Sequence, residues 1–402
     1  MSEILFIFAS EMAKKREISV TRTSLPPFEE FCEAIRPLWE SHIVTNMGPL
    51  HEQFAAALQA RWGLDGITLF SHGHLALEAT LEALATSRHS GLDLESPQVI
   101  TTPFTFVSTV HAIVRCGFTP VFADVLPEDG TMDPSSLEPL ISERTAAILP
   151  VHVYGNPCDV EAIDAIARQH GIPVIYDAAH AFDIYYKDIP LVRYGDASIL
   201  SFHATKVFST VEGGAVCLSS QGIAKAKGIS LRLDDIKNFG IRDEETCVYP
   251  GGNGKMNELE AAMGLCNLRH IDEEIASRGE AYMSYLEALQ PILAKPDAAV
   301  RLLRSRPGTR PNYAYFPLLL PDQTSRDSLY TALRAEGIHA RKYFWPLASN
   351  TDCYRSLASE RMGNASKTPV ATDLAARVLC LPLFAGLQRD DIEHIASAVQ
   401  NI

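Results

Sequence analysis

The chain has 402 residues, enough for two or three domains of ordinary size around a large buried core. Acidic side chains outnumber basic ones by 49 to 35, and the net charge of −14 argues against nucleic acid or an anionic membrane as partner, because both attract basic surfaces. The eight cysteines are scattered without a Cys-x-x-Cys pair, so we expect no metal site or disulfide framework, only reduced thiols in the cytoplasm.

The first part of the chain is predicted to be an extension and arm, residues 1–45. Residues 4–9 are apolar, but no basic segment precedes them, so we expect no secretory signal. No apolar run reaches transmembrane length, and we expect no membrane partner. Helices are predicted over residues 27–38 and 49–62, with a turn at 45–49 between them.

Strand and helix patterns alternate between residues 67 and 218. The predicted strands are 67–72, 99–106, 120–124, 146–154, 173–178, 198–202 and 214–218. The predicted helices between them are 73–85, 107–115, 134–142 and 160–170. This alternation predicts crossover connections and a mostly parallel, seven-stranded α/β sheet with helices on both faces. We assign residues 46–270 to this large domain.

The pattern changes after residue 220. The predicted elements of this part are helices at 258–269 and 272–294 and strands at 313–320, 340–344 and 378–383. They indicate a smaller C-terminal α+β domain, residues 271–402.

Lys206 lies between two predicted strands, with Thr205 and Val207 beside it and no acidic residue within five positions. A lysine in partly apolar surroundings loses hydration of its ammonium form, so its pKa falls and the neutral amine becomes a nucleophile toward aldehydes. We therefore hypothesise that Lys206 forms a Schiff base with pyridoxal phosphate. Taken alone, an exposed loop lysine is the commoner case.

Two further candidates follow the predicted strand 173–178. Asp177 ends an apolar run, where a carboxylate is costly to bury without a partner, and a protonated pyridine nitrogen would be such a partner. His180 would reach the face of that ring or its 3′ oxygen. The alternatives are a helix-capping or loop aspartate and a buried histidine with its hydrogen bonds satisfied within the protein.

Three other strand ends complete the predicted site, because ligands of open parallel sheets bind at the carboxyl ends of the strands. Gly73 and His74 begin a helix, where backbone amides bind phosphate, and Ser201 offers a hydroxyl to the same group. Phe106 would stack on a pyridine ring. An ordinary turn at Gly73 and core packing of Phe106 are the alternatives.

Several motifs resemble the DegT/DnrJ/StrS family of sugar aminotransferases, from about residue 18 to the end of the chain. The similar segments are Tyr176–Ala181, Gly195–Asp196, Ser201–Lys206, Glu212–Ala215, Asn253–Asn257, Glu260–Gly264, Arg341–Leu347 and Leu381–Leu383. The resemblance implies a fold-type-I aminotransferase that binds pyridoxal 5′-phosphate in the large domain. It also implies a homodimer with active sites shared at the subunit interface.

The resemblance also implies the roles of individual residues. Lys206 would carry the Schiff base, Asp177 would pair with the pyridine nitrogen, and His180 would lie beside the ring. The remaining cofactor-binding residues would be Phe106 as the stacking aromatic, Gly73, His74 and Ser201 around the phosphate, and Asn253 from the partner chain.

Two positions depart from the family pattern. His74 replaces a common threonine, and Ala348 stands where a histidine commonly follows Pro-Leu, which leaves the role of His74 and the sugar contacts open. Lys206 is kept where some relatives carry histidine and catalyse dehydration, which favours transamination.

The resemblance implies amino transfer from L-glutamate to the keto sugar of a nucleotide-diphosphate sugar, in deoxysugar or polysaccharide biosynthesis. A dTDP-4-keto-6-deoxyhexose is the first choice of acceptor. The alternatives are a 3-keto sugar aminotransferase, a pyridoxal-phosphate-dependent sugar dehydratase and a non-catalytic regulatory protein that binds the cofactor. A nicotinamide-dependent oxidoreductase is disfavoured because no predicted strand is followed by Gly-x-Gly-x-x-Gly.

Overall fold

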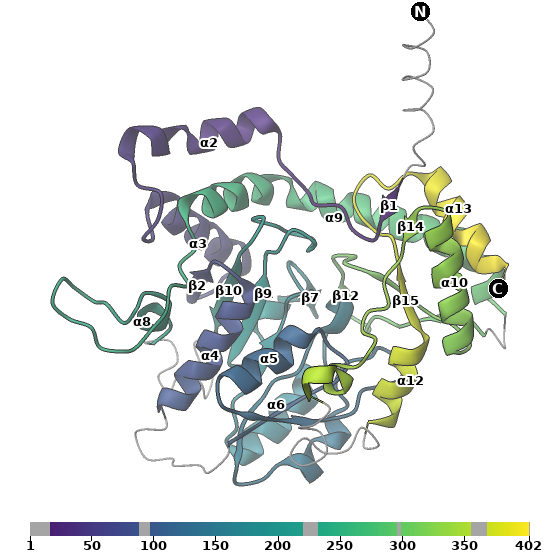
Figure 1. Cartoon of the computed structure of the whole chain (residues 1–402), viewed down its shortest axis with the longest axis horizontal. Coiled ribbons are helices and arrows are strands. Elements are labelled where there is room, and N and C mark those ends of the chain that lie inside the picture. Colours follow the sequence, from purple (N-terminus) through teal and green to yellow (C-terminus); the bar gives the residue numbers. More distant parts are fainter. Residues whose placement is uncertain (1–16, 88–96, 220–231, 296–298, 355–367, 402) are drawn as a thin grey trace, which may run out of the picture.

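The computed structural model of the chain describes residues 17–87, 97–219, 232–295, 299–354 and 368–401. An α/β region occupies most of the first 220 residues, and a smaller region from the C-terminal part of the chain lies beside it (Figure 1). The 36-residue helix α9 (Glu258–Leu293) runs from one region to the other.

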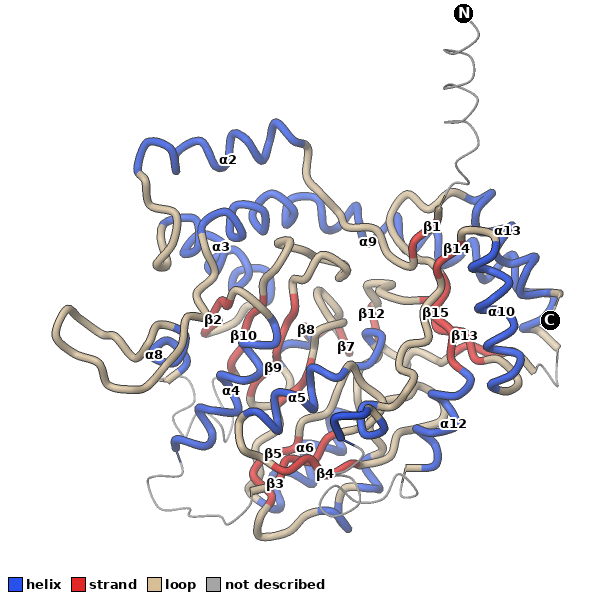
Figure 2. The backbone as a smooth tube through the Cα atoms, in the orientation of Figure 1, coloured by secondary structure: helices blue, strands red, loops and turns tan. Residues whose placement is uncertain are grey.

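Two sheets form the centre of the larger region. The first has the strand order β2 (Gly66–Phe70), β10 (Gly214–Leu218), β9 (Ala197–Ser201), β6 (Ile175–Asp177). The second has the order β4 (Thr119–Phe122), β3 (Gln98–Thr101), β5 (Thr145–Ile148) and lies below the first in Figure 2. Parallel bridges from Ile148 to Val174 and from Val151 to Asp177 join β5 to β6. The three-stranded sheet therefore lies edge to edge with the four-stranded sheet.

The strand directions agree with the predicted α/β class. The pairs β3–β4, β3–β5 and β6–β9 are parallel, and β10 is antiparallel to both of its neighbours. One predicted helix in this region is wrong: residues 134–142 form two short 3-10 turns, η2 (Pro134–Ser136) and η3 (Glu138–Leu140). Pro139, in the middle of the segment, lacks the amide hydrogen that a continuous helix would use there.

Helices cover both faces of the sheets. They are α3 (Pro49–Trp62), α4 (Gly73–Ser87), α5 (Val107–Arg115) and α6 (Val160–His170). Successive strand residues point to opposite faces, so Ile100 packs in the cluster that contains α3 and α6, whereas Val99 packs in the cluster that contains α4 and α5. Burial on both faces explains why these strands are apolar throughout.

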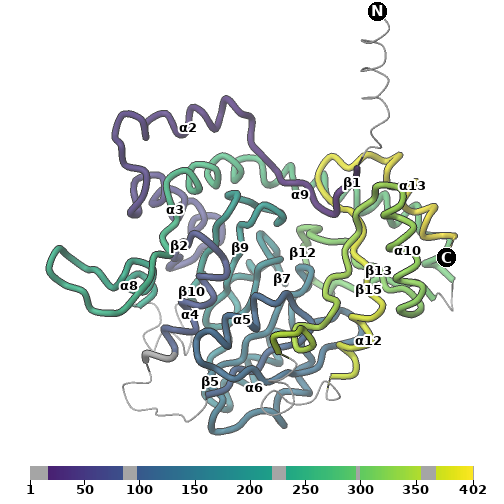
Figure 3. The backbone as a smooth tube through the Cα atoms, viewed as in Figure 1, coloured from purple at the N-terminus to yellow at the C-terminus, as the bar shows by residue number. Residues whose placement is uncertain are grey.

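The C-terminal region has its own sheet and its own apolar cluster. The elements are β11 (Arg301–Leu302), β13 (Phe316–Leu319), α10 (Gln323–Ala335), α12 (Pro369–Arg377), β15 (Val378–Leu381) and α13 (Arg389–Gln400). The strand predicted at 340–344 is wrong, because β14 (Ile338–His339) ends earlier and only Arg341 forms a bridge, to Cys380. β14 pairs with β1 (Ile18–Ser19), so the purple start of the chain lies beside this region in Figure 3.

Helix α9 joins the two regions. Two helices were expected here, but residues 269–272 contain neither glycine nor proline and the helix continues through them. The predicted domain boundary at residue 270 stays a prediction. It starts with a capping box in which the side chains of Asn257 and Glu260 each accept from the other's backbone amide. Its two ends pack on α3 and on α13.

Among the described residues, no helix is both long enough and apolar enough to cross a bilayer.

Glu258, the first residue of α9, offers a test of this packing. Its carboxylate is fully buried and accepts hydrogen bonds from the amides of Leu50 at 2.8 Å and His51 at 3.0 Å, in the first turn of α3. Glu258→Ala leaves these amides unpaired and should lower the free energy of unfolding by about 2 kcal/mol. Chemical denaturation measures the change. The control Glu280→Ala, at an exposed position of α9, should change it by less than about 0.5 kcal/mol. Equal losses in the two variants would contradict the buried cap.

Candidate active site

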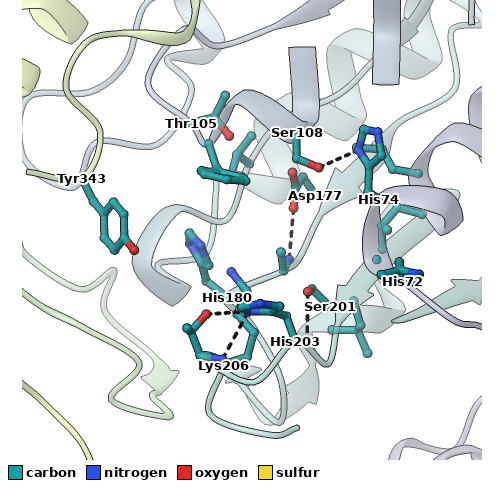
Figure 4. Close-up of a pocket in the computed structure, with 18 of the residues that line it drawn as sticks. His72, His74, Thr105, Ser108, Asp177, His180, Ser201, His203, Lys206 and Tyr343 are labelled. Carbon is teal, nitrogen blue, oxygen red and sulfur yellow. Dashed lines mark hydrogen bonds between the residues drawn. The ribbon is translucent and has the colours of Figure 1, made fainter. Parts of the chain in front are cut away.

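A pocket of about 310 Å³ lies at the carboxyl ends of β6 and β9, beside the start of α4 (Figure 4). Seven of the residues predicted from the sequence line it: Gly73, His74, Phe106, Asp177, His180, Ser201 and Lys206. The volume suits a small organic ligand, and the position is the one where parallel sheets bind ligands.

Lys206 lies on the loop between β9 and β10 with its side chain half-buried against the pocket. Burial lowers the pKa of its ammonium group to about 8, and the charge of Asp177 opposes this change. A substantial fraction of the amine is therefore neutral near pH 8, the form that reacts with aldehydes.

Asp177 is buried at the end of β6. Its Oδ1 accepts a hydrogen bond from the amide of Ala179 at 3.1 Å, and its Oδ2 accepts one from the hydroxyl of Thr109 at 2.7 Å. A helix-capping role is excluded, because no helix begins within residues 178–190, and Asp177 lies instead where β6 passes into a loop. The carboxylate is held by both oxygens at the wall of the pocket.

His180 is buried, and its protonation state follows from its contacts. The backbone amide of Tyr154 donates to Nδ1 at 3.1 Å, so the proton of the neutral ring is on Nε2. Burial lowers the pKa of this imidazole far below its usual value, and the charge of Lys206 lowers it further. The ring lies parallel to that of Phe344, with 5.9 Å between the ring centres. His180 is therefore a neutral hydrogen-bond donor at the pocket.

Gly73, Ser201 and Gly214 approach one another closely beside the start of α4. A Cβ atom on Gly73 would lie 2.8 Å from Cβ of Ser201, and one on Gly214 would lie 2.5 Å from Cα of Gly73. Only glycine fits at both positions. The first turn of α4 consequently lies directly beside the hydroxyl of Ser201, and backbone amides of such a turn suit a phosphate group.

The other predicted residues are placed as follows. Both ring nitrogens of His74 have partners in the chain: Nδ1 is 2.8 Å from Oγ of Ser108 and Nε2 is 3.2 Å from Oε1 of Glu78. A phosphate contact of His74 would therefore come from its backbone amide.

Phe106 is 56% exposed at the pocket, so core packing is excluded for it.

Asn253 is exposed and does not line the pocket of its own chain. Its side-chain oxygen accepts a hydrogen bond from Lys255 at 2.9 Å. The prediction for Asn253 concerned the partner chain, and it stays a prediction.

Several lining residues were not singled out from the sequence as site residues. They are His72, Thr105, Ser108, His203, Glu212, Tyr315, Tyr343 and Phe344. Tyr343 belongs to a C-terminal segment that did stand out, but its approach to the pocket depends on the packing of the two regions. Thr109, the partner of Asp177, occupies the first turn of α5, directly after Phe106.

The residues fit pyridoxal phosphate. The glycine-lined turn beside Ser201 matches a phosphate, the buried carboxylate of Asp177 matches a pyridine nitrogen, and the amine of Lys206 matches an aldehyde. All three groups border one pocket.

The sequence was compared with known families. The model of the DegT/DnrJ/EryC1/StrS aminotransferase family matches residues 28–400. The chain belongs to this family. As a DegT/DnrJ/EryC1/StrS member it is a pyridoxal-phosphate-dependent sugar aminotransferase, which confirms the class of enzyme, the cofactor and the fold inferred from the motifs.

Relatives of this DegT/DnrJ/EryC1/StrS protein cover nearly its whole length. A Shigella dysenteriae protein named dTDP-4-amino-4,6-dideoxy-D-glucose transaminase is 38% identical over 390 residues, which cover 96% of this chain and 100% of the relative. An Escherichia coli protein of the same name is 39% identical over 386 residues, covering 94% and 97%. The solved structure of DesI in the presence of its TDP-sugar product matches with a TM-score of 0.84 and 30% identity, covering 97% of this chain and 93% of that one.

The close approach at Gly214 can be tested by adding one methyl group. Gly214→Ala should lower the free energy of unfolding by about 1–3 kcal/mol, because the new Cβ meets the backbone of Gly73, and it should weaken the binding of pyridoxal phosphate. The control is Gly66→Ala in the neighbouring strand β2, where a Cβ meets nothing within 4 Å. Denaturation and cofactor titration measure both effects. A tightly binding, fully stable Gly214→Ala protein would contradict the steric argument.

The lowered pKa of Lys206 predicts how cofactor uptake depends on pH. The amine must be neutral to attack the aldehyde, so the rate at which cofactor-free protein takes up pyridoxal phosphate should rise as pH increases through about 8 and level off above it. Stopped-flow absorbance measures this rate. A rise that begins only near the ordinary lysine pKa of about 10.4 would show that burial does not act on this amine.

Proposed function

We propose that the protein transfers an amino group from L-glutamate to the keto sugar of a dTDP-4-keto-6-deoxyhexose. The observation that carries the proposal is the presence of Lys206, with its lowered pKa, and buried Asp177 at one pocket. The names of the Shigella and Escherichia coli relatives support a dTDP-linked 4-amino-4,6-dideoxy sugar as the product type.

When bound, pyridoxal phosphate supplies an aldehyde that condenses with amines and a ring that accepts electrons as the bond between Cα and hydrogen breaks. The amine of Lys206 takes the proton from Cα of the donor and, in the second half of the cycle, delivers a proton to the sugar carbon. Asp177 keeps a proton on the pyridine nitrogen through its negative charge. The same groups act in both halves because the second half reverses the first.

The remaining residues bind and orient. Gly73 and Ser201 would hold the phosphate, Phe106 would pack against the pyridine ring, and His180 would donate a hydrogen bond from Nε2. Because His180 stays neutral, it adds no second positive charge beside Lys206.

We propose further that the enzyme acts as a homodimer with shared active sites. The loop that follows α8 (Leu233–Lys237) projects from the body of the chain in Figure 1 and carries Asn253 near its end. This loop exposes Phe239, Ile241 and Val248, whose apolar surface favours contact with another chain. Asn253 would reach the partner's cofactor from this loop.

A GDP-linked keto sugar is a second candidate for the acceptor. A Caulobacter vibrioides relative, 28% identical over 365 residues, is named GDP-perosamine synthase. A dehydratase is disfavoured because Lys206 is retained. A 3-keto acceptor remains the second choice for the sugar.

The decisive experiment supplies L-glutamate with dTDP- or GDP-linked 4-keto-6-deoxy sugars and a dTDP-linked 3-keto sugar. We expect 2-oxoglutarate and an amino sugar to form fastest with the dTDP-linked 4-keto sugar. Lys206→Ala should remove the visible absorption band of the bound cofactor and lower the rate at least about 100-fold. Lys187→Ala, at an exposed lysine paired with Glu161, should change neither. Loss of water from the sugar without 2-oxoglutarate, or faster turnover of another acceptor, would refute the proposed reaction.

A further inference from the structure

Behind Asp177, two threonine side chains form a buried hydrogen-bonded chain. The hydroxyl of Thr109 lies 2.7 Å from Oδ2 of Asp177, and the hydroxyl of Thr105 lies 2.8 Å from that of Thr109. The side chains of Thr105 and Thr109 are 3% and 0% exposed. Both hydrogen bonds are therefore largely shielded from bulk water.

The direction of each hydrogen bond follows from the chemistry of the groups. An ionised carboxylate only accepts, so Thr109 donates its single hydroxyl hydrogen to Asp177. The contact between the two hydroxyls must then be donated by Thr105. A protonated Asp177 that donated to Thr109 would reverse the chain, and the hydrogen of Thr105 would need another acceptor. Among the described residues, the structure shows no hydrogen-bond partner for that hydroxyl other than Thr109.

We propose that Thr109 and Thr105 are positioning residues that keep Asp177 in its ionised form and orient it toward the pyridine nitrogen of the cofactor. This inference rests on the role proposed above for Asp177. Oδ1 is held by the amide of Ala179 and Oδ2 by Thr109, so both oxygens are fixed from within the protein. Each oxygen keeps capacity for one further hydrogen bond.

The chain of hydroxyls also ties two walls of the pocket together. Thr105 precedes Phe106, the predicted stacking aromatic, and Thr109 lies one turn further along the start of α5. The segment that carries the aromatic ring therefore also holds the carboxylate. A displacement of one would be transmitted to the other.

The test compares Thr109→Val, which keeps the shape but removes the hydroxyl, with Thr109→Ser, which keeps the hydroxyl. Each protein is loaded with pyridoxal phosphate labelled with nitrogen-15 in the ring, and the nitrogen chemical shift is followed against pH. We expect Thr109→Val to lose the ring proton at a lower pH than the unaltered protein and to raise the cofactor dissociation constant about tenfold. Thr109→Ser should restore both.

Thr80→Val is the matched control, since Thr80 is equally buried but donates to the carbonyl of Ala76 in α4, away from Asp177. It should leave the nitrogen titration unchanged. If Thr109→Val titrates like Thr80→Val, the inference is wrong. Thr105→Val, measured in the same way, replaces Thr109→Val should that protein not fold. No sugar substrate enters these measurements, so a failure to aminate nucleotide sugars would refute the proposed function and not this inference.

Discussion

The backbone of Asp177 joins the two sheets of the larger region, and its carboxylate borders the pocket. Its amide donates to the carbonyl of Pro150 at 2.9 Å, and its carbonyl accepts from the amide of His152 at 3.0 Å, while the strand it ends pairs with β9 on the other side. The position of the carboxylate is therefore set by strand pairing on both sides. Everything else in the site is arranged around a group that the sheet itself holds in place.

Burial lowers the pKa of two basic side chains at the pocket, Lys206 and His180, but it leaves them with different chemistry. It brings the pKa of Lys206 to about 8, with Asp177 opposing the shift, so the amine can exist in both forms. It lowers the pKa of His180 so far that the ring stays neutral, and the amide of Tyr154 then selects the position of its proton. One residue can exchange protons, and the other can only donate a fixed hydrogen bond.

Local patterns predicted much of the fold and part of the site. The bounds of α3, α5, α6 and β10 agree with the predictions, because each segment has clear periodicity or a proline, glycine or aspartate at its edge. Asp177, His180 and Lys206 were predicted at the site because they follow apolar strands; all three line the pocket, and their roles toward the cofactor stay predictions. Thr109 and Phe344 were not, since their contacts join residues far apart in the sequence. The continuity of α9 was missed although residues 269–272 contain no glycine or proline that would end a helix.

The wall formed by Tyr343 and Phe344 comes from a late part of the chain, whereas the glycine-lined turn and the reactive lysine lie between residues 73 and 214. During translation, the ribosome therefore exposes most of the groups that hold the cofactor well before the segment that encloses them. Until that segment is synthesised, the chain lacks the ring that lies parallel to that of His180. Synthesis thus completes this wall of the pocket last.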